Sequence, residues 1–276
     1  MITLVNIGNS NHELMSLSIN KTMSSVPHIN SVSIVSNKEV NINSSYNLFK
    51  IPDNFNLLDY CDFCIKSMNS VVDTEFVLIN QYDGIATNPS AWTDEFLEYD
   101  YVGSLSHVDH PPVQGSLQSS GFYEDYKDTN WFTCGGGLSL RSKKLLTILA
   151  EDDRIKTINY KDGYDTPFIS EDLVITLLNR DYLEKEHGIR FAPVELGMKF
   201  CAEVMTGYTN ALGFHGWHNA PLYLTEEECL YFFSRLVKPD YINNTAPMQM
   251  CKYHTMMRGY LQLREYFLQN DKWIIY

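Results

Sequence analysis

Val77-Leu78-Ile79-Asn80-Gln81-Tyr82-Asp83-Gly84 is the stretch of sequence that decides the fold. The apolar run 76–79 is typical of a buried strand, and the chain then reaches a carboxylate and a glycine. In open α/β sheets, ligands bind beyond the carboxyl ends of the strands, so Asp83 is well placed to contact a ligand. Asp-Gly is also a common turn dipeptide, so a plain turn remains the alternative interpretation of these two residues alone.

The segments before this strand predict a parallel α/β sheet. Residues 2–7 are β-rich, residues 12–25 carry an apolar helical face, and residues 31–36 indicate a second strand. A strand–helix–strand order at the start of a chain favours parallel pairing. Residues 37–54 are rich in Asn and Ser and are expected to form a loop. A helix is predicted over residues 55–70, with one apolar face made of Leu57, Cys61, Cys64, Ile65 and Met68.

The second half of the chain offers further elements and two stretches without periodicity. A short helix is predicted over residues 89–97 and a strand over residues 99–103. Residues 104–130 show little periodicity and are expected to form a long loop, and residues 159–169 are polar and contain glycine. The last helix is predicted over residues 247–269.

The composition is that of a globular protein, 44% hydrophobic and 20% charged over 276 residues. No apolar run approaches the ~18–20 residues of a transmembrane segment. The N-terminus lacks the basic region of a secretion signal, so we expect a cytoplasmic protein. The formal net charge of −13 at pH 7 disfavours a surface that tracks phosphates, so nucleic acid is not an expected partner.

The cysteine pattern does not by itself indicate a metal site. Six cysteines are few for this length, and free thiols are expected in a reducing compartment. Cys61-x-x-Cys64 has the spacing of half a zinc site or of a redox pair, but there is no second such motif. Both cysteines lie on the apolar face of the predicted helix, which favours packing in the core.

Three later motifs add to the evidence from Asp83. Gly135 to Gly137 precede a predicted strand over residues 138–141, and glycines allow backbone to approach a ligand closely. Ser170-Glu171-Asp172 opens a helix predicted over residues 173–183, where Ser170 suits the N-cap and two acids suit the positive helix end. His215 lies between Phe214 and Gly216, where an imidazole can be exposed to a cleft.

In this order, the four motifs resemble those of the GT-A-fold glycosyltransferases. That family carries a D-x-D-type acid after a strand, a glycine-rich loop, an x-E-D motif and a C-terminal metal-binding histidine. The phrases "FVLINQYDG", "GGGLSLRSKKLL" and "GFHG" also resemble a smaller group of predicted bacterial and viral glycosyltransferases. The resemblance covers about residues 50 to 220 and implies an α/β fold with a mainly parallel sheet flanked by helices.

Carried over to this sequence, the resemblance implies roles for individual residues. Asp83 matches the last acid of the D-x-D motif and His215 the C-terminal histidine, so the two would bind one Mn²⁺ or Mg²⁺ ion. Asp172 matches the catalytic base, with Glu171 beside it. Gly84 would border the donor site.

Two more positions complete the implied site. Gly135, Gly136 and Gly137 would line the sugar or acceptor side. The first acid of D-x-D is replaced by Gln81, which can hydrogen-bond a ribose but is a poor ligand for a hard cation.

The function implied is transfer of a hexose or related sugar from a nucleoside-diphosphate sugar to a glycan or other hydroxyl acceptor. The cation would neutralise the leaving diphosphate, and Asp172 would accept the acceptor's proton. A base and a leaving group on opposite faces of the sugar would give inversion. Two alternatives stay open: a non-catalytic nucleotide-sugar-binding module, and a glycosyltransferase acting on modified DNA bases. We expect a GT-A domain over residues 1–221 and a helical extension over residues 222–276 packed on it.

Overall fold

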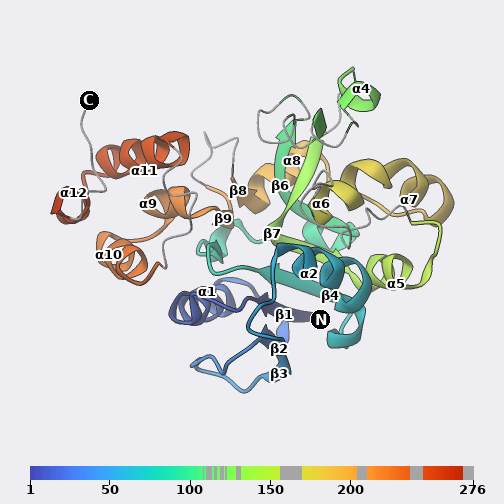
Figure 1. The fold of residues 1–276 in the computed structure, drawn as a ribbon, viewed down its shortest axis with the longest axis horizontal. Helices are drawn as coiled ribbons and strands as arrows, with labels where there is room; N and C mark the ends of the chain where they lie inside the picture. The colour runs from blue at the N-terminus through green and yellow to red at the C-terminus, as the bar shows by residue number, and fades with distance from the viewer. Residues whose placement is uncertain are drawn as a thin grey trace.

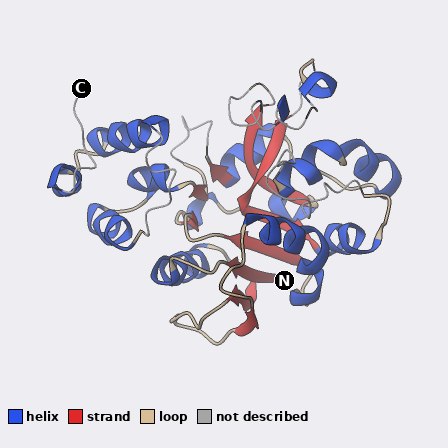
Figure 2. Cartoon of the chain, in the orientation of Figure 1, coloured by secondary structure: helices blue, strands red, loops and turns tan. Residues whose placement is uncertain are grey.

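The fold is described by a computed structural model. The described residues are 1–107, 109, 114, 117–118, 121, 123–128, 132–155, 170–203, 210–236 and 245–269. They form a mixed α/β structure in which helices flank a central sheet, and the C-terminal helices gather at one end of the molecule, near α1 (Figures 1 and 2). Within the described part of the chain, no helix combines the length and apolar character needed to cross a bilayer.

The central sheet has six strands in the order β3-β2-β1-β4-β7-β6. Strand β7 is antiparallel to both of its neighbours, while β3, β2, β1 and β4 are parallel to one another, so the sheet is mainly parallel as the sequence predicts. The strands are β1 (Ile2–Ile7), β2 (Ile29–Ser36), β3 (Asn47–Lys50), β4 (Phe76–Asn80), β6 (Tyr101–His107) and β7 (Phe132–Ser142).

The first part of the chain follows the sequence prediction closely. The strand over 2–7 and the helix α1 (His12–Ser25) have the predicted bounds, and β4 ends one residue later than predicted. The predicted loop 37–54 is wrong in one place, since it contains the edge strand β3. Only Leu48 and Phe49 are apolar in β3, and all four of its residues are partly or fully exposed, so no hydrophobic pattern marks this strand.

The helix predicted over residues 55–70 is present but is divided into three pieces. It comprises α2 (Leu57–Asp62), one π-turn over Phe63–Ser67 and one 3₁₀-turn over Met68–Val71. Cys61 and Cys64 are fully buried, which confirms that they pack in the core, and all six cysteines are buried free thiols. Leu57 was wrongly placed on the apolar face; as the first residue of the helix, it is 57% exposed.

The glycine motif lies inside a strand, which corrects the expectation of a loop before a short strand. Strand β7 begins at Phe132, so the glycines lie within it; Gly135 pairs with Ser104 of β6, while Gly136 and Gly137 fall between the paired residues. A register shift opposite these glycines, between Gly103 and Ser104, bends the pairing with β6. Of the predicted loop 104–130, β6 takes the residues up to His107 and the short helix α4 (Tyr123–Tyr126) lies further on, while parts of the stretch between and after them fall outside the described residues. The polar stretch 159–169 also falls outside the described residues.

A second, three-stranded sheet connects the end of β4 to the C-terminal part of the chain. It consists of β5 (Gly84–Ala86), β9 (Gly213–His215) and β8 (Cys201–Ala202), in the order β5-β9-β8. Strand β5 starts directly after Asp83 and pairs antiparallel with β9, so Gly84 lies opposite His215. This register brings two distant sequence motifs together at the carboxyl end of β4.

The remaining helices cover the sheet or form the C-terminal group. The predicted last helix is two helices, separated at Gly259, which has a positive φ of 66°. Their apolar side chains join a core cluster that also contains Leu14 of α1 and Ile85 of β5. The helices are η3 (Pro89–Ala91), η4 (Asp94–Glu98), α5 (Lys143–Glu151), α6 (Glu171–Leu173), η6 (Val174–Leu178), α7 (Arg180–His187), α8 (Val194–Phe200), η7 (Trp217–Asn219), α9 (Ala220–Tyr223), α10 (Glu226–Arg235), α11 (Thr245–Met257) and α12 (Leu261–Gln269).

We predict that Gly84→Ala destabilises the fold by about 1–3 kcal/mol or more, because overpacking a tight site forces backbone to move. A Cβ at this position would lie 2.1 Å from the carbonyl oxygen of Gly137. Gly8→Ala is the matched control, since its Cβ would approach no atom more closely than 3.4 Å. Urea unfolding measures both variants, and equal stabilities would show that β5 and β7 are not held this closely.

Candidate active site

Asp83 is held in a short turn between β4 and β5. The Ser18 hydroxyl of α1 lies 2.8 Å from the carbonyl oxygen of Gln81 and 3.1 Å from that of Gly84, so it can donate to either. The backbone N–H of Gln81 donates a hydrogen bond to the backbone carbonyl oxygen of Gly137 in β7 at 2.9 Å. Asp83 itself is 6% exposed, and its Oδ2 accepts a hydrogen bond from the Trp217 amide at 3.2 Å. Contacts with α1, β7 and η7 thus fix the turn on three sides.

His215 lies beside this turn. Its Nε2 is 3.9 Å from Asp83 Oδ1 and 3.1 Å from Gln81 Oε1. The structure therefore brings together Asp83, Gln81 and His215, as the resemblance implies. That the first and last of these share a metal ion stays a prediction.

Glu203, which sequence reasoning missed, is the other direct partner of His215. Its Oε1 lies 2.7 Å from His215 Nδ1, and its Oε2 accepts a hydrogen bond from the Ser104 hydroxyl of β6. The signal in the sequence was a carboxylate directly after the buried residues Cys201 and Ala202, the same kind of signal that marks Asp83. It is weak here because β8 is only two residues long.

The two acids of the Ser170-Glu171-Asp172 motif have different surroundings. Glu171 is 3% exposed, and its Oε1 accepts a hydrogen bond from Arg141 Nη2 at 2.8 Å; the Arg141 side chain is fully buried. Asp172 is partly exposed, and its Oδ2 accepts from the Gly136 amide at 3.1 Å. The Ser170 side chain does not cap the helix, which corrects the predicted N-cap, because its hydroxyl donates to Asp172 Oδ1.

The three consecutive glycines of β7 leave room for three of these side chains. A Cβ on Gly135 would lie 2.4 Å from Glu203 Oε2, one on Gly136 would lie 2.2 Å from Glu171 Oε1, and one on Gly137 would lie 2.0 Å from His215 Nε2. Real Cβ atoms do not approach polar atoms so closely. The glycine motif therefore sets how near these groups can come to β7, while its contact with sugar or acceptor stays a prediction.

The charges of this cluster shift one another's pKa values. Burial raises the pKa of Glu203, but the charge and hydrogen bond of His215 outweigh it and lower that pKa to about 2. Burial lowers the pKa of His215, but Glu203 outweighs it and raises that pKa to about 9. Burial, with a further contribution from Glu171, raises the pKa of Asp172 to about 7, and burial raises the pKa of Asp83.

Asp83 and His215 offer donor atoms of a suitable type for a divalent cation but too few of them, so a bound ligand would have to supply the rest. No group of three or more His, Cys, Asp or Glu side chains in the described ranges is placed to hold a metal ion. Two protein atoms are nevertheless within reach of one ion, because ligand distances of about 2.1 Å allow about 4.2 Å between two ligand atoms. Oδ1 of Asp83 and Nε2 of His215 are 3.9 Å apart.

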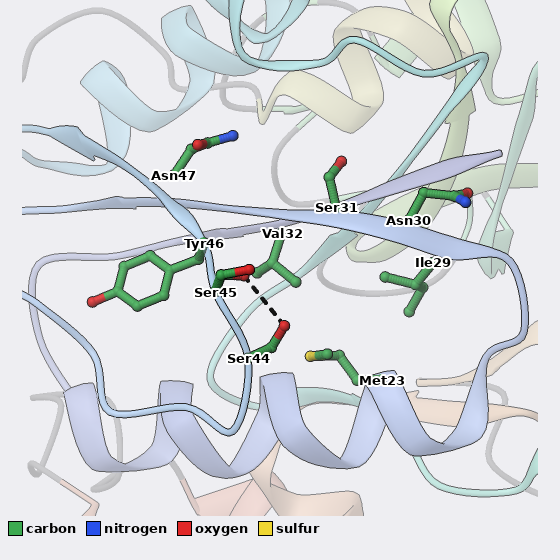
Figure 3. A pocket seen from close by; sticks show the side chains of 9 residues that line it. All are labelled: Met23, Ile29, Asn30, Ser31, Val32, Ser44, Ser45, Tyr46 and Asn47. Atoms are coloured by element: carbon green, nitrogen blue, oxygen red, sulfur yellow. Dashed lines mark hydrogen bonds between the residues drawn. The ribbon is translucent and has the colours of Figure 1, made fainter.

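A separate pocket of about 210 Å³ lies between α1 and the first residues of β2 and β3 (Figure 3). The first residues of β2 line this pocket, and they lie at the same end of the sheet as the start of β4. Asp83 follows the end of β4, so the pocket and the candidate site are at opposite ends of the sheet. None of its lining residues is acidic, basic or a histidine, so it offers no charged side chain to a ligand. The lining residues are Met23, Ile29, Asn30, Ser31, Val32, Ser44, Ser45, Tyr46 and Asn47.

A family model described as "Protein of unknown function (DUF5672)" matches residues 52–215, more than half of the chain. The chain belongs to the DUF5672 family. The matched region includes Asp83, Asp172, Glu203 and His215, and it ends at the histidine. No curated protein matches the sequence significantly. The match names no bacterial or viral group, so that finer part of the resemblance stays a prediction.

One solved glycosyltransferase structure has a similar backbone over most of the chain. The galactosyltransferase LgtC, solved with donor and acceptor sugar analogs, has a TM-score of 0.52 and 12% sequence identity, covering 86% of this chain and 98% of its own. This likeness shows that the DUF5672 chain has the mixed α/β architecture of the GT-A glycosyltransferases.

Two fungal structures are more distant. Core-mannan synthase A (CmsA/Ktr4) from Aspergillus fumigatus, in a Mn/GDP form, has a TM-score of 0.39 and 8% identity, covering 63% of this chain and 69% of its own. The mannosyltransferase Ktr4p from S. cerevisiae, in complex with GDP, has a TM-score of 0.35 and 11% identity, covering 54% and 59%.

The buried Glu171–Arg141 pair generates a stability prediction for this DUF5672 chain. Removing one partner of a buried ion pair leaves an uncompensated charge and costs about 3–5 kcal/mol. We expect this loss for Glu171→Gln, measured by urea unfolding. Glu195→Gln, an exposed position on α8 with the same change in charge, should alter stability by no more than about 0.5 kcal/mol. Similar small effects at both positions would contradict the buried pair.

Proposed function

We propose that the chain is a metal-dependent glycosyltransferase that moves a sugar from a nucleoside-diphosphate sugar to an acceptor hydroxyl. The observation that carries the proposal is the meeting of Asp83 and His215, at 3.9 Å, at the carboxyl end of β4 in a GT-A architecture. Ligands of open α/β sheets bind at this edge, where the strand order reverses. Here β2 and β3 lie on one side of β1 and β4 lies on the other, so the reversal falls beside Asp83.

The charge of the site explains why a divalent cation is needed. Three carboxylates, those of Glu203, Asp83 and Asp172, are close enough to His215 to raise its pKa. Their negative charges would also repel a diphosphate bound at the same place. Asp83 Oδ1 and His215 Nε2 would hold the ion, and the nitrogen donor favours Mn²⁺ over Mg²⁺. When bound, the ion would neutralise the negative charge that develops on the leaving diphosphate.

The nucleoside part of the donor would lie over the ends of β1 and β2. Polar side chains that follow these strands are linked into a hydrogen-bond network. Asn37 Nδ2 donates to Asp53 Oδ1 at 2.8 Å, and Asn9 Nδ2 donates to the Phe55 carbonyl at 2.6 Å. His12 Nε2 lies 2.8 Å from Asn37 Oδ1. Amide, imidazole and carboxylate groups of this kind suit a base and a ribose.

Asp172 is our candidate for the general base. It is partly exposed, whereas Glu171 is committed to Arg141, so we assign Glu171 a structural role. A catalytic base works best when its pKa is near the operating pH, and the pKa of Asp172 is raised to about 7. With the base and the leaving group on opposite faces of the sugar, we propose inversion of the anomeric configuration.

The metal prediction is tested by nucleotide binding. We expect the protein to bind a nucleoside diphosphate in the presence of Mn²⁺, and Asp83→Ala to abolish this binding while the protein still folds. Asp62→Ala, an exposed acid on α2, is the matched control and should bind as the wild type does. Isothermal titration measures the affinities. Unchanged affinity in Asp83→Ala would remove Asp83 from the site.

A panel of nucleotide sugars with Mn²⁺, screened by thermal shift, would identify the donor, because a ligand that binds only the folded state raises the melting temperature. Donor binding without transfer or hydrolysis would support the alternative of a non-catalytic binding module, to which Gln81 in place of an acid also points.

The base prediction is tested by the pH dependence of transfer. The ionised carboxylate is the active form, so the wild-type rate should rise with pH through about 7. Asp172→Asn should lower transfer by about 10²–10⁴-fold while donor affinity barely changes. Ser170→Ala is the informative control, because the Ser170 hydrogen bond lowers the pKa of Asp172. Its loss should move the rising limb to higher pH and leave the rate at high pH intact. Full activity in Asp172→Asn would place the base elsewhere.

A further inference from the structure

The Glu203 side chain is fixed by two elements that are distant in sequence. One carboxylate oxygen binds His215 Nδ1 of β9 at 2.7 Å, and the other accepts from the Ser104 hydroxyl of β6. The Asn219 amide Nδ2 donates to the backbone carbonyl oxygens of both Glu203 and His215, at 3.0 and 2.8 Å. The side chain and the backbone of this pair are therefore both held.

This arrangement decides which ring nitrogen of His215 faces the site. A carboxylate only accepts hydrogen bonds, so the nitrogen beside Glu203 must carry a proton. With the ring protonated, Nε2 also donates to Gln81 Oε1 at 3.1 Å. In the neutral ring the remaining proton stays beside the carboxylate, so the lone pair is on Nε2, which faces Gln81 and Asp83. A metal-binding histidine whose other nitrogen donates to a carboxylate has a fixed ring orientation and a more basic ligand atom.

We propose that Glu203 is a positioning residue that holds the His215 imidazole with Nε2 directed at Asp83, ready to bind a divalent cation. The part concerning the cation rests on the proposed function; the part concerning the ring does not. Gly135 belongs to the same device, because a Cβ there would lie 2.2 Å from Ser104 Oγ and 2.4 Å from Glu203 Oε2. A side chain at this position would displace the carboxylate from His215.

The orientation of the ring is tested by NMR, independently of any ligand. Two-bond ¹H–¹⁵N correlation spectra, recorded without metal at alkaline pH where the ring is neutral, report which nitrogen of His215 carries the proton. We expect the Nδ1–H form in the wild type and a mixture of both forms in Glu203→Ala. Glu203→Gln keeps an accepting oxygen and should restore much of the wild-type preference. A wild-type ring protonated on Nε2 would overturn the proposal.

The consequence for the cation is tested by Mn²⁺ binding in the presence of a nucleoside diphosphate. We expect Glu203→Ala to weaken Mn²⁺ binding by about 10–100-fold, as loss of such a partner does elsewhere, and Glu203→Gln to weaken it less. Glu195→Gln removes the same charge from the surface and should bind as the wild type does. Electron paramagnetic resonance of free Mn²⁺ measures the affinities.

The outcomes separate this proposal from the proposed function. Wild-type affinity in a folded Glu203→Ala would overturn the positioning role for the cation. Absence of Mn²⁺ binding in the wild type would overturn the proposed function and the cation part, while the NMR result would still decide whether Glu203 orients His215. If Glu203→Ala does not fold, Glu203→Gln and Ser104→Ala supply the same two measurements, and wild-type behaviour in both would count against the proposal.

Discussion

The candidate site depends on one backbone constraint, the antiparallel pairing of β5 with β9. In this pairing Gly84 lies opposite His215, and Gly84 also packs against the Gly137 carbonyl of β7. Because Asp83 immediately precedes β5, the register of this short ladder fixes the position of the carboxylate relative to the imidazole. A one-residue slip would turn the His215 side chain to the other face of the small sheet. The other contacts of the site refine a geometry that this pairing has already set.

Four acidic side chains lie near this strand pairing, and they differ in how their charge is balanced. Arg141 neutralises Glu171 inside the core, and His215 neutralises Glu203 at the edge of the site. Asp83 and Asp172 accept hydrogen bonds from backbone amides, and Asp172 also accepts one from the Ser170 hydroxyl; among the described residues neither has an ion pair as close as these two. Burial raises the pKa of both. These are the two groups for which we propose roles in holding a cation and accepting a proton, which is consistent with the tendency of perturbed carboxylates to cluster at functional sites.

The sequence predicts most of the parallel half of the sheet, because β1, α1, β2 and β4 have clear hydrophobic patterns. It does not predict β3, which has only two apolar residues and lies at the sheet edge, or the full length of β7, since three glycines resemble a loop. Asp83, Asp172 and His215 were found through short motifs. Glu203 was missed because its partner His215 is brought to it by tertiary pairing, which no local pattern encodes. The division of the chain at residue 221 stays a prediction.

The most direct test of the account is a crystal structure of the protein with Mn²⁺ and a nucleoside diphosphate, with anomalous diffraction used to locate the ion. The account predicts one anomalous peak between Asp83 Oδ1 and His215 Nε2, in contact with diphosphate oxygens, at the carboxyl end of β4. An ion bound elsewhere, or a diphosphate bound away from this pair, would contradict it.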